Sequence, residues 1–199
     1  MVNRVSIGVL GIQGAVSEHV NVMSLTLKEK DIKGTVFVVK NKEQISSIDG
    51  LIMPGGESTT ISRVLCKSGI NKEILKRTER NDLPIMGTCA GCVILAKEIG
   101  DDATEINSLR LMDMEIKRNA FGRQKNSFEQ KIDINGFAQP YNAVFIRAPV
   151  ITKVWGKCKI LAKIDKKIVM ARQDKLLASS FHPELANDLR IHEYFLEMF

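Results

Sequence analysis

A cysteine held between two glycines is the feature of this sequence best suited to chemistry. Residues 87–91 read Gly-Thr-Cys-Ala-Gly, after a short apolar run and before residues 93–98, which have helical character. This spacing is typical of a tight strand-to-helix turn that holds a nucleophile clear of a sheet, where a larger residue at either glycine would clash. A helix beginning just after Cys89 would point free N–H groups at its sulfur and favour the thiolate. The pattern predicts that Cys89 is a catalytic nucleophile.

Two other interpretations of Cys89 compete with this one. A buried cysteine commonly serves as a small apolar side chain with no chemical role. Cys89 and Cys92 also form a C-x-x-C pair, which in a thioredoxin-like protein is a redox dithiol. The flanking glycines favour the nucleophile over the apolar role, whereas the redox pair has to be judged from the rest of the chain.

His182 is the candidate base for Cys89. The sequence His182-Pro183-Glu184 follows a predicted strand at 176–181. Proline biases the residue before it towards extended backbone, and in an extended chain residues two apart point to the same side. We therefore expect His182 and Glu184 to face one site, where a carboxylate orients the imidazole for proton transfer with the cysteine.

Three further polar segments lie at predicted strand ends. Residues 54–58 (Pro-Gly-Gly-Glu-Ser) have consecutive glycines whose N–H groups suit an anion or oxyanion nest, although a plain turn has the same composition. The segments 118–124 and 145–149 each contain arginine, which can hold a substrate carboxylate or lie on the surface. His19 and His192, in contrast, fall within predicted helices and are expected at the surface.

The order of predicted elements indicates an α/β fold. The first half of the chain alternates strands with helices, at 5–10, 18–30, 35–39, 42–47, 51–53, 59–66, 72–80 and 84–88. The second half is rich in strands, at 111–117, 128–133, 143–147, 159–164, 168–172 and 176–181, with a hairpin turn at 165–167 and a last helix at 189–198. We predict a three-layer, flavodoxin-like domain with a mostly parallel central sheet, helices on both faces and additional antiparallel strands in the C-terminal half.

Length and composition are those of one globular domain, residues 1–199, with 44% hydrophobic and 26% charged residues. The net charge of +6 is spread along the chain, with no interleaved aromatic residues, so we expect no nucleic-acid partner. Four scattered cysteines, no signal peptide and no membrane-length apolar run predict a cytoplasmic protein with no membrane association. We expect no metal and no cofactor.

Taken together, these segments resemble the triad-type glutamine amidotransferases and, among them, the glutaminase subunits of two-protein pyridoxal 5′-phosphate synthases. The resemblance covers nearly the whole chain. Residues 87–91 and 182–184 mark the superfamily, and the subfamily is marked by Gln-Gly-Ala-Val at 13–16, Arg-Asn-Ala-Phe-Gly-Arg-Gln at 118–124 and Phe-Ile-Arg-Ala-Pro at 145–149. Cys92 departs from the pattern, because an apolar residue is more usual there, but a buried cysteine packs like one.

The resemblance implies a Cys-His-Glu triad of Cys89, His182 and Glu184. This triad would hydrolyse L-glutamine to L-glutamate and ammonia through a γ-glutamyl thioester. The oxyanion would be held by N–H groups of Ala90 and of the turn that contains Gly56. The implied glutamine contacts are Gly56, Glu57, Ser58, Arg118, Ile146 and Arg147.

The resemblance also implies a partner protein. Gln13 and its loop would lie at the interface with a synthase subunit in a hetero-oligomeric complex. That subunit would receive the ammonia along a protected path and build pyridoxal 5′-phosphate from a pentose phosphate and a triose phosphate.

Three alternatives stay open on the sequence. The chain could be the glutaminase of another amidotransferase, such as that of histidine biosynthesis, although the segment 118–124 favours the pyridoxal phosphate system. It could be a dithiol redox protein using Cys89 and Cys92, in which case the flanking glycines and His-Pro-Glu would have no role. It could also be a regulatory module that keeps the fold without catalysis, which the intact triad argues against.

Overall fold

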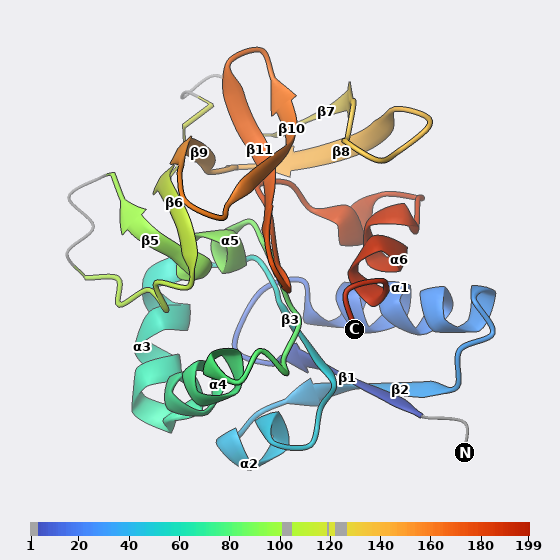
Figure 1. Ribbon diagram of the computed structural model, residues 1–199, viewed down its shortest axis with the longest axis vertical. Coiled ribbons are helices and arrows are strands. Elements are labelled where there is room, and N and C mark those ends of the chain that lie inside the picture. The colour runs from blue at the N-terminus through green and yellow to red at the C-terminus, as the bar shows by residue number, and fades with distance from the viewer. Residues whose placement is uncertain (1–3, 101–104, 119, 122–126) are drawn as a thin grey trace.

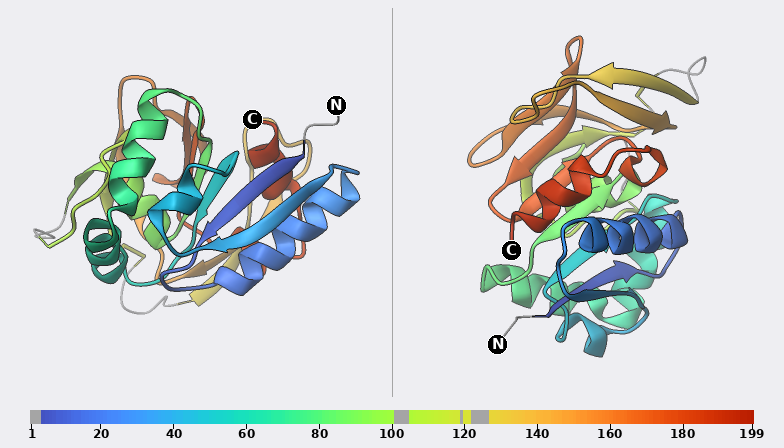
Figure 2. Two further views of the ribbon diagram at one scale, coloured as in Figure 1. Left: turned by 90° about the horizontal axis from the view of Figure 1, so that it is seen from below. Right: turned by 90° about the vertical axis from the view of Figure 1, so that its right-hand side faces the viewer.

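The centre of the protein is a ten-stranded mixed sheet with helices packed on both of its faces (Figures 1 and 2). The computed structural model describes residues 4–100, 105–118, 120–121 and 127–199. Its helices are α1 (Val16–Glu29), α2 (Lys42–Ile45), α3 (Ser58–Ser68), α4 (Ile70–Glu79), α5 (Ala90–Leu95) and α6 (Arg190–Leu196), with a 3-10 turn η1 (Pro183–Leu185). Its strands are β1 (Val5–Leu10), β2 (Gly34–Val39), β3 (Gly50–Met53), β4 (Ile85–Thr88), β5 (Ala96–Ile99), β6 (Met112–Lys117), β7 (Ser127–Ile132), β8 (Tyr141–Ile146), β9 (Val150–Val154), β10 (Lys159–Ile164), β11 (Lys167–Gln173) and β12 (Leu176–Ser179).

The first half of the chain and the last strand make the parallel part of the sheet. Strands β2, β1, β3, β4 and β12 are neighbours in that order and all run parallel. Beyond β12 the sheet continues through β11, β9 and β6 with antiparallel pairing, and β7 and β8 form a separate hairpin. The predicted fold class is confirmed. Because the parallel strands end at one edge, the loops after β1, β3, β4 and β12 meet there.

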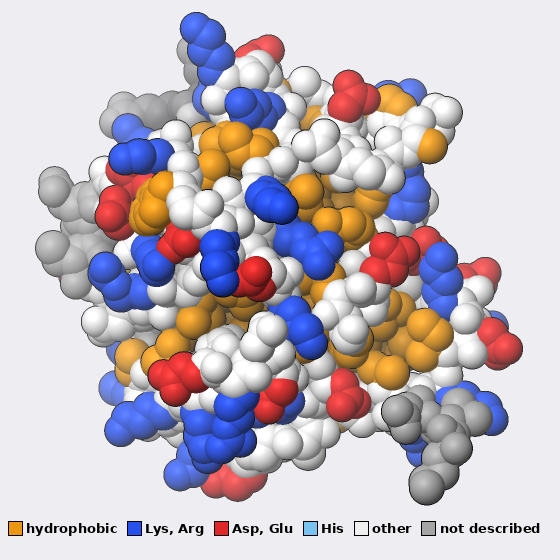
Figure 3. Space-filling model, in the orientation of Figure 1, with side chains coloured by type: hydrophobic (Ala, Val, Ile, Leu, Met, Phe, Trp, Pro, Cys, Tyr) orange, Lys and Arg blue, Asp and Glu red, His pale blue; other side chains and the backbone are white. Residues whose placement is uncertain are grey.

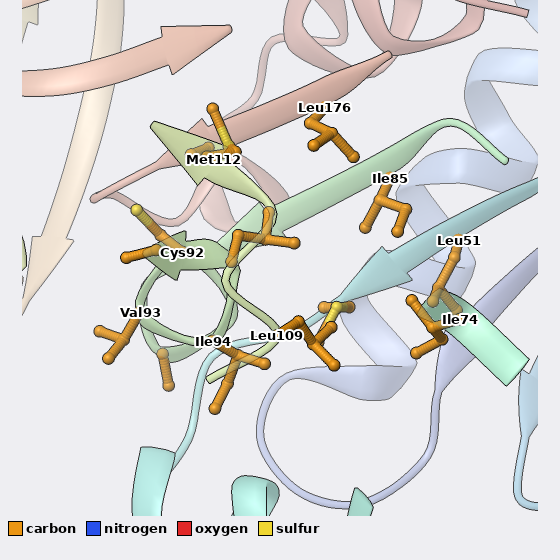
Figure 4. Close-up of a cluster of buried hydrophobic side chains, with 14 of the residues drawn as sticks. Leu51, Ile74, Ile85, Cys92, Val93, Ile94, Leu109, Met112 and Leu176 are labelled. Atoms are coloured by element: carbon orange, nitrogen blue, oxygen red, sulfur yellow. The ribbon is translucent and has the colours of Figure 1, made fainter. Parts of the chain in front are cut away.

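Two apolar cores hold the helices on the sheet. Strand β3 contributes to both, since Leu51 and Met53 belong to one core and Ile52 to the other, as side chains alternate along a strand. One core takes in apolar residues of α2 to α5 (Figure 4), and the other takes in residues of α1, α6, β7 and β8. The right-hand view of Figure 2 shows α1 and α6 side by side on their face. The central strands are therefore buried on both faces, as their continuous apolar sequence predicts.

Two strands depart from the expectations. Helical character was predicted for 93–98, but α5 ends at Leu95 and β5 begins at Ala96. Strand β5 forms because it pairs in parallel with β6, and β9, which was not predicted, pairs with β6 and β11. Both strands lie where pairing between distant segments decides the structure. The predicted hairpin turn after β10 is confirmed, and Asp165 has the positive φ of 50° that such turns often need.

The charged surface is mixed. On the face drawn in Figure 3, Lys and Arg side chains lie among acidic and apolar ones over most of the surface. None of the helices in the described part of the chain is long and apolar enough to cross a membrane.

Candidate active site

Cys89 lies at the sharp turn between β4 and α5. Its backbone has φ 50° and ψ −106°, a strained conformation for a residue with a side chain. A hydrogen bond to the neighbouring strand holds this backbone in place, because the Cys89 N–H donates to the Ser179 carbonyl of β12 at 2.8 Å. A side chain at Gly91 would collide with the Met53 carbonyl, and one at Gly87 would approach the Gly91 carbonyl oxygen to 2.6 Å. The predicted need for both glycines is confirmed.

His182 and Glu184 form a hydrogen-bonded pair beneath this turn. Nδ1 of His182 lies 2.7 Å from Oε1 of Glu184, and both residues are buried. The prediction that His182 and Glu184 lie close together is confirmed. The predicted extended backbone is wrong, because Pro183–Leu185 is a 3-10 turn. The turn curls Glu184 back under the imidazole, while the His182 N–H donates to the Val144 carbonyl of β8 at 2.8 Å.

Gly55, in the loop after β3, lies between the cysteine and the histidine. A Cβ atom placed on Gly55 would be 2.8 Å from Cε1 of His182 and 3.2 Å from Cβ of Cys89. Three strand ends therefore bring one glycine, one thiol and one imidazole together. Only a residue without a side chain fits between the other two.

The electrostatics of the site favour a charged imidazole. Burial opposes protonation of His182, but its interactions with Cys89 and Glu184 outweigh it and raise the pKa of His182 to about 10. Burial likewise opposes ionisation of Glu184, but its hydrogen bond with His182 and its contact with His19 lower the pKa of its carboxyl group. The imidazolium is thus stabilised between the sulfur on one side and a carboxylate on the other.

The cysteine opens into a pocket of about 780 Å³ that also contains the His182 ring. Glu184 is not part of the pocket lining and lies behind His182. The lining includes every residue predicted for the oxyanion hole, the substrate and the partner loop: Gln13, Gly56, Glu57, Ser58, Ala90, Arg118, Ile146 and Arg147. Their roles stay predictions, but the structure brings all of them to one cavity. Among the described residues, no three His, Cys, Asp or Glu side chains are grouped to hold a metal.

Gln13 contacts and stabilises the loop after β3, which contains Gly55 and Gly56. Its Oε1 accepts the Glu57 N–H at 3.0 Å, and its side chain packs over Gly56, which has φ 133°. The next residue, Gly14, has φ 91° and leaves no room for a side chain beside the Gly55 carbonyl. The loops after β1 and β3 therefore support each other at the pocket.

The pocket also includes residues that were not singled out. Val93, Phe121, Ala148 and Pro149 line it. Three of them fall in the segments 118–124 and 145–149, so the segments were recognised although these side chains were not. Residues 119 and 122–124 of the first segment lie outside the described residues.

The expectation that His19 and His192 lie at the surface is wrong. Both residues are fully buried. Nε2 of His19 lies 3.2 Å from Oε2 of Glu184. A helical assignment alone does not say which face a residue occupies. The spacing of the residues could have indicated that His19 is buried. His19 precedes Met23 and Leu27 by four and eight residues, so the three residues share one face of the helix, which is buried.

Cys92 is poorly suited to be a redox partner of Cys89. It is fully buried on α5, and burial, reinforced by Cys89 and Cys158, raises the pKa of its thiol well above the ordinary value. A thiol kept protonated is a weak nucleophile. All four cysteines of the chain are unpaired.

Known proteins share this arrangement over nearly the whole chain. The SNO glutamine amidotransferase family matches residues 9–199. Proteins named pyridoxal 5′-phosphate synthase subunit PdxT are similar to it: that of Methanococcoides burtonii is 49% identical and that of Staphylothermus marinus 47%, each covering 96% of this chain and 97% of the relative. A crystal structure of a glutamine amidotransferase superposes with a TM-score of 0.87 at 42% identity, covering 96% of this chain and 97% of that one.

A more distant glutamine amidotransferase, from Thermotoga maritima, shares the fold with a TM-score of 0.61 at 13% identity, covering 98% of this chain and 84% of that one. The family match starts in β1 and runs through the cysteine turn and the His-Pro-Glu turn to the last residue. This chain belongs to the SNO glutamine amidotransferase family.

Proposed function

We propose that this protein is the glutaminase subunit of a pyridoxal 5′-phosphate synthase, hydrolysing L-glutamine to L-glutamate and ammonia. The observation that carries the proposal is the 2.7 Å contact between His182 and Glu184 at the base of the pocket that holds Cys89. The names of relatives that are 43–49% identical to it support the choice of synthase.

The proposed reaction has two halves. In the first, Sγ of Cys89 attacks the side-chain amide carbon, the C–N bond breaks, and His182 gives its proton to the departing ammonia. In the second, His182 takes a proton from water as the water oxygen attacks the thioester carbon and the C–S bond breaks. Glu184 holds the imidazole in one orientation throughout, as the carboxylate of a triad does.

The oxyanion of each tetrahedral intermediate needs hydrogen-bond donors. The Ala90 N–H follows the nucleophile directly at the start of α5, and the loop containing Gly55 and Gly56 lies across the cysteine. We propose that N–H groups from these two places form the oxyanion hole. Removing one such donor typically costs about 3 kcal/mol of transition-state stabilisation.

The charges of the pocket suit an amino acid. Free glutamine has an α-carboxylate and an α-ammonium group, and the pocket offers the guanidinium groups of Arg118 and Arg147 and the carboxylate of Glu57. Arginine binds carboxylates in a bidentate geometry. We therefore assign these three residues, with Gly56, Ser58 and Ile146, to substrate binding.

The rim of the pocket suits a protein partner. Ile146 lines the pocket, and its large apolar side chain is 37% exposed. Exposed large apolar side chains beside a pocket are typical of an interaction surface. We propose that the synthase subunit docks here, with the loop of Gln13, and receives the ammonia.

The test is glutamate release from glutamine, measured with and without the purified synthase subunit. We expect activity that Cys89→Ala abolishes and that Cys92→Ala, the matched change three residues later, leaves close to wild type. Undiminished release by Cys89→Ala would exclude the assigned nucleophile. Loss of activity in Cys92→Ser, together with a reversible Cys89–Cys92 disulfide, would instead support the redox protein.

A further inference from the structure

The second oxygen of the Glu184 carboxylate faces a buried histidine that the proposed reaction does not use. Oε1 of Glu184 binds His182, whereas Oε2 lies 3.2 Å from Nε2 of His19, and both side chains are completely buried. Oε2 has no well-aligned hydrogen bond among the described residues, so this close contact with His19 is the interaction available to it. Nε2 of His19 also contacts the hydroxyl group of Thr88 at 3.0 Å, one residue before the cysteine.

A third histidine determines which nitrogen of His19 carries the proton. Nε2 of His192, on α6, lies 3.4 Å from Nδ1 of His19. The other His192 nitrogen, Nδ1, is buried and has no hydrogen-bond partner among the described residues, so a proton there would be left unpaired. Burial is the main reason that the pKa of His192 is lowered to about 3, so His192 is neutral.

The neutral His192 therefore carries its proton on Nε2 and donates it to Nδ1 of His19. His19 then carries a proton on Nε2, the nitrogen that faces Glu184 and Thr88. The hydrogen-bond directions are consistent from α6 to Nε2 of His19, whose one proton faces both the Thr88 hydroxyl group and the Glu184 oxygen. Such outer partners orient a functional group and are costly to remove.

We propose that His19 is a positioning residue for glutamine hydrolysis, which holds Oε2 of Glu184 so that Oε1 stays directed at Nδ1 of His182. The inference rests on the proposed function, because the triad is what His19 would position. His19 does not line the pocket, so it acts on the reaction through its neighbours, of which Glu184 is the one that contacts the base. The titratable groups around that carboxylate are His182 and His19, with His192 and Tyr141 further away.

The experiment replaces His19 in the complex with the synthase subunit and measures kcat, KM and the pH profile. We expect His19→Leu to lower kcat roughly 10- to 100-fold, the usual effect of losing an outer partner, with KM for glutamine unchanged. The alkaline limb of kcat should move to lower pH, because a displaced Glu184 supports the His182 imidazolium less. His19→Gln, whose amide nitrogen reaches the Nε2 position, should restore most of the kcat.

Thr26→Val is the matched control. Thr26 is equally buried on α1, and its hydroxyl group donates only to the Val22 carbonyl of the same helix. We expect unchanged kcat and pH limbs in this variant. A purely structural role of His19 would lower kcat at every pH without moving the limb, and that result would overturn the proposal.

Two further outcomes distinguish a failure of the positioning role of His19 from a failure of the proposed glutaminase function. If wild type turns over glutamine and His19→Leu matches it in kcat and pH profile, the positioning role is wrong and the proposed function stands. If wild type shows no turnover with the synthase subunit, both are wrong. Where His19→Leu does not fold, His19→Asn replaces it, because its shorter amide does not reach Glu184, and equal activity of the Asn and Gln variants would refute the role.

Discussion

The glycine between the nucleophile and the base gives the sharpest prediction from this structure. Replacing Gly55 with alanine adds one methyl group 2.8 Å from Cε1 of His182 and 3.2 Å from Cβ of Cys89. Carbon atoms pack at about 3.5 Å or more, so the imidazole has to move by roughly 0.7 Å. The cysteine gives way less easily, because its backbone is strained and is hydrogen-bonded to β12.

The expected cost is mainly catalytic. Misplacing a catalytic group by about 1 Å can lower the rate about 100-fold. Overpacking costs about 1–3 kcal/mol of unfolding free energy, which leaves a typical domain folded. We therefore expect Gly55→Ala to lower kcat for glutamate release by up to about 100-fold while circular dichroism and the unfolding transition show a folded protein.

Gly100→Ala is the control for this change. Its new methyl group would meet the tip of the Glu115 side chain, which can swing away, and Gly100 itself does not line the pocket. Unaltered kcat in that variant and a large loss in Gly55→Ala is the predicted pair of results. Wild-type kcat in a folded Gly55→Ala protein would show that the observed placement of His182 is not what the reaction uses.

Other perturbations test the charges and the scaffold. Glu184→Gln should lower kcat and move its alkaline limb to lower pH, because the carboxylate is one of the two groups, with Cys89, that raise the pKa of His182; an unmoved limb would contradict this. The raised pKa of His182 should also make wild type more stable than His182→Gln below about pH 6.5, with the difference lost as pH rises towards 10, which urea unfolding across that range checks. Arg190→Ala should lower the free energy of unfolding by roughly 1–3 kcal/mol in the same assay. Its guanidinium group binds Asp188 and the carbonyls of Gln139 and Pro140, and it packs on Tyr141. Lys76→Ala, which removes an exposed ion pair, should change that free energy by less than about 1 kcal/mol.

Local sequence was sufficient for the parts of the site where the backbone itself is the constraint. The glycines around Cys89 predict a turn that only glycine permits, and the structure has that turn. The continuous apolar runs of β1, β3 and β4 predict strands buried on both faces, and the helices between them force a parallel sheet. These features follow from dihedral angles and burial, which neighbouring residues in the sequence determine.

Features set by contacts between distant segments were not predictable in this way. Strand β5 continues directly from α5 because β6 is available to pair with it, and nothing in residues 96–99 themselves requires a strand. The buried position of His19 depends on where α1 is packed. A role for His19 can be inferred only once the structure shows Glu184 beside it. A polar residue in a predicted helix was assigned to the surface because two of its partners, Glu184 and His192, lie more than 160 residues away.

The 3-10 turn after His182 is the detail that connects these points. In an extended chain, Glu184 would point to the same side as His182 and enter the pocket, where a carboxylate would occupy space and charge that a substrate needs. The turn instead directs Glu184 beneath the ring, buried and outside the pocket lining. A buried carboxylate has to be paired on both oxygens, since an unpaired buried charge costs several kcal/mol. His182 satisfies one oxygen from the side of the pocket, and our proposal places the donor for the other on α1, where His19 lies 3.2 Å away in the interior of the protein.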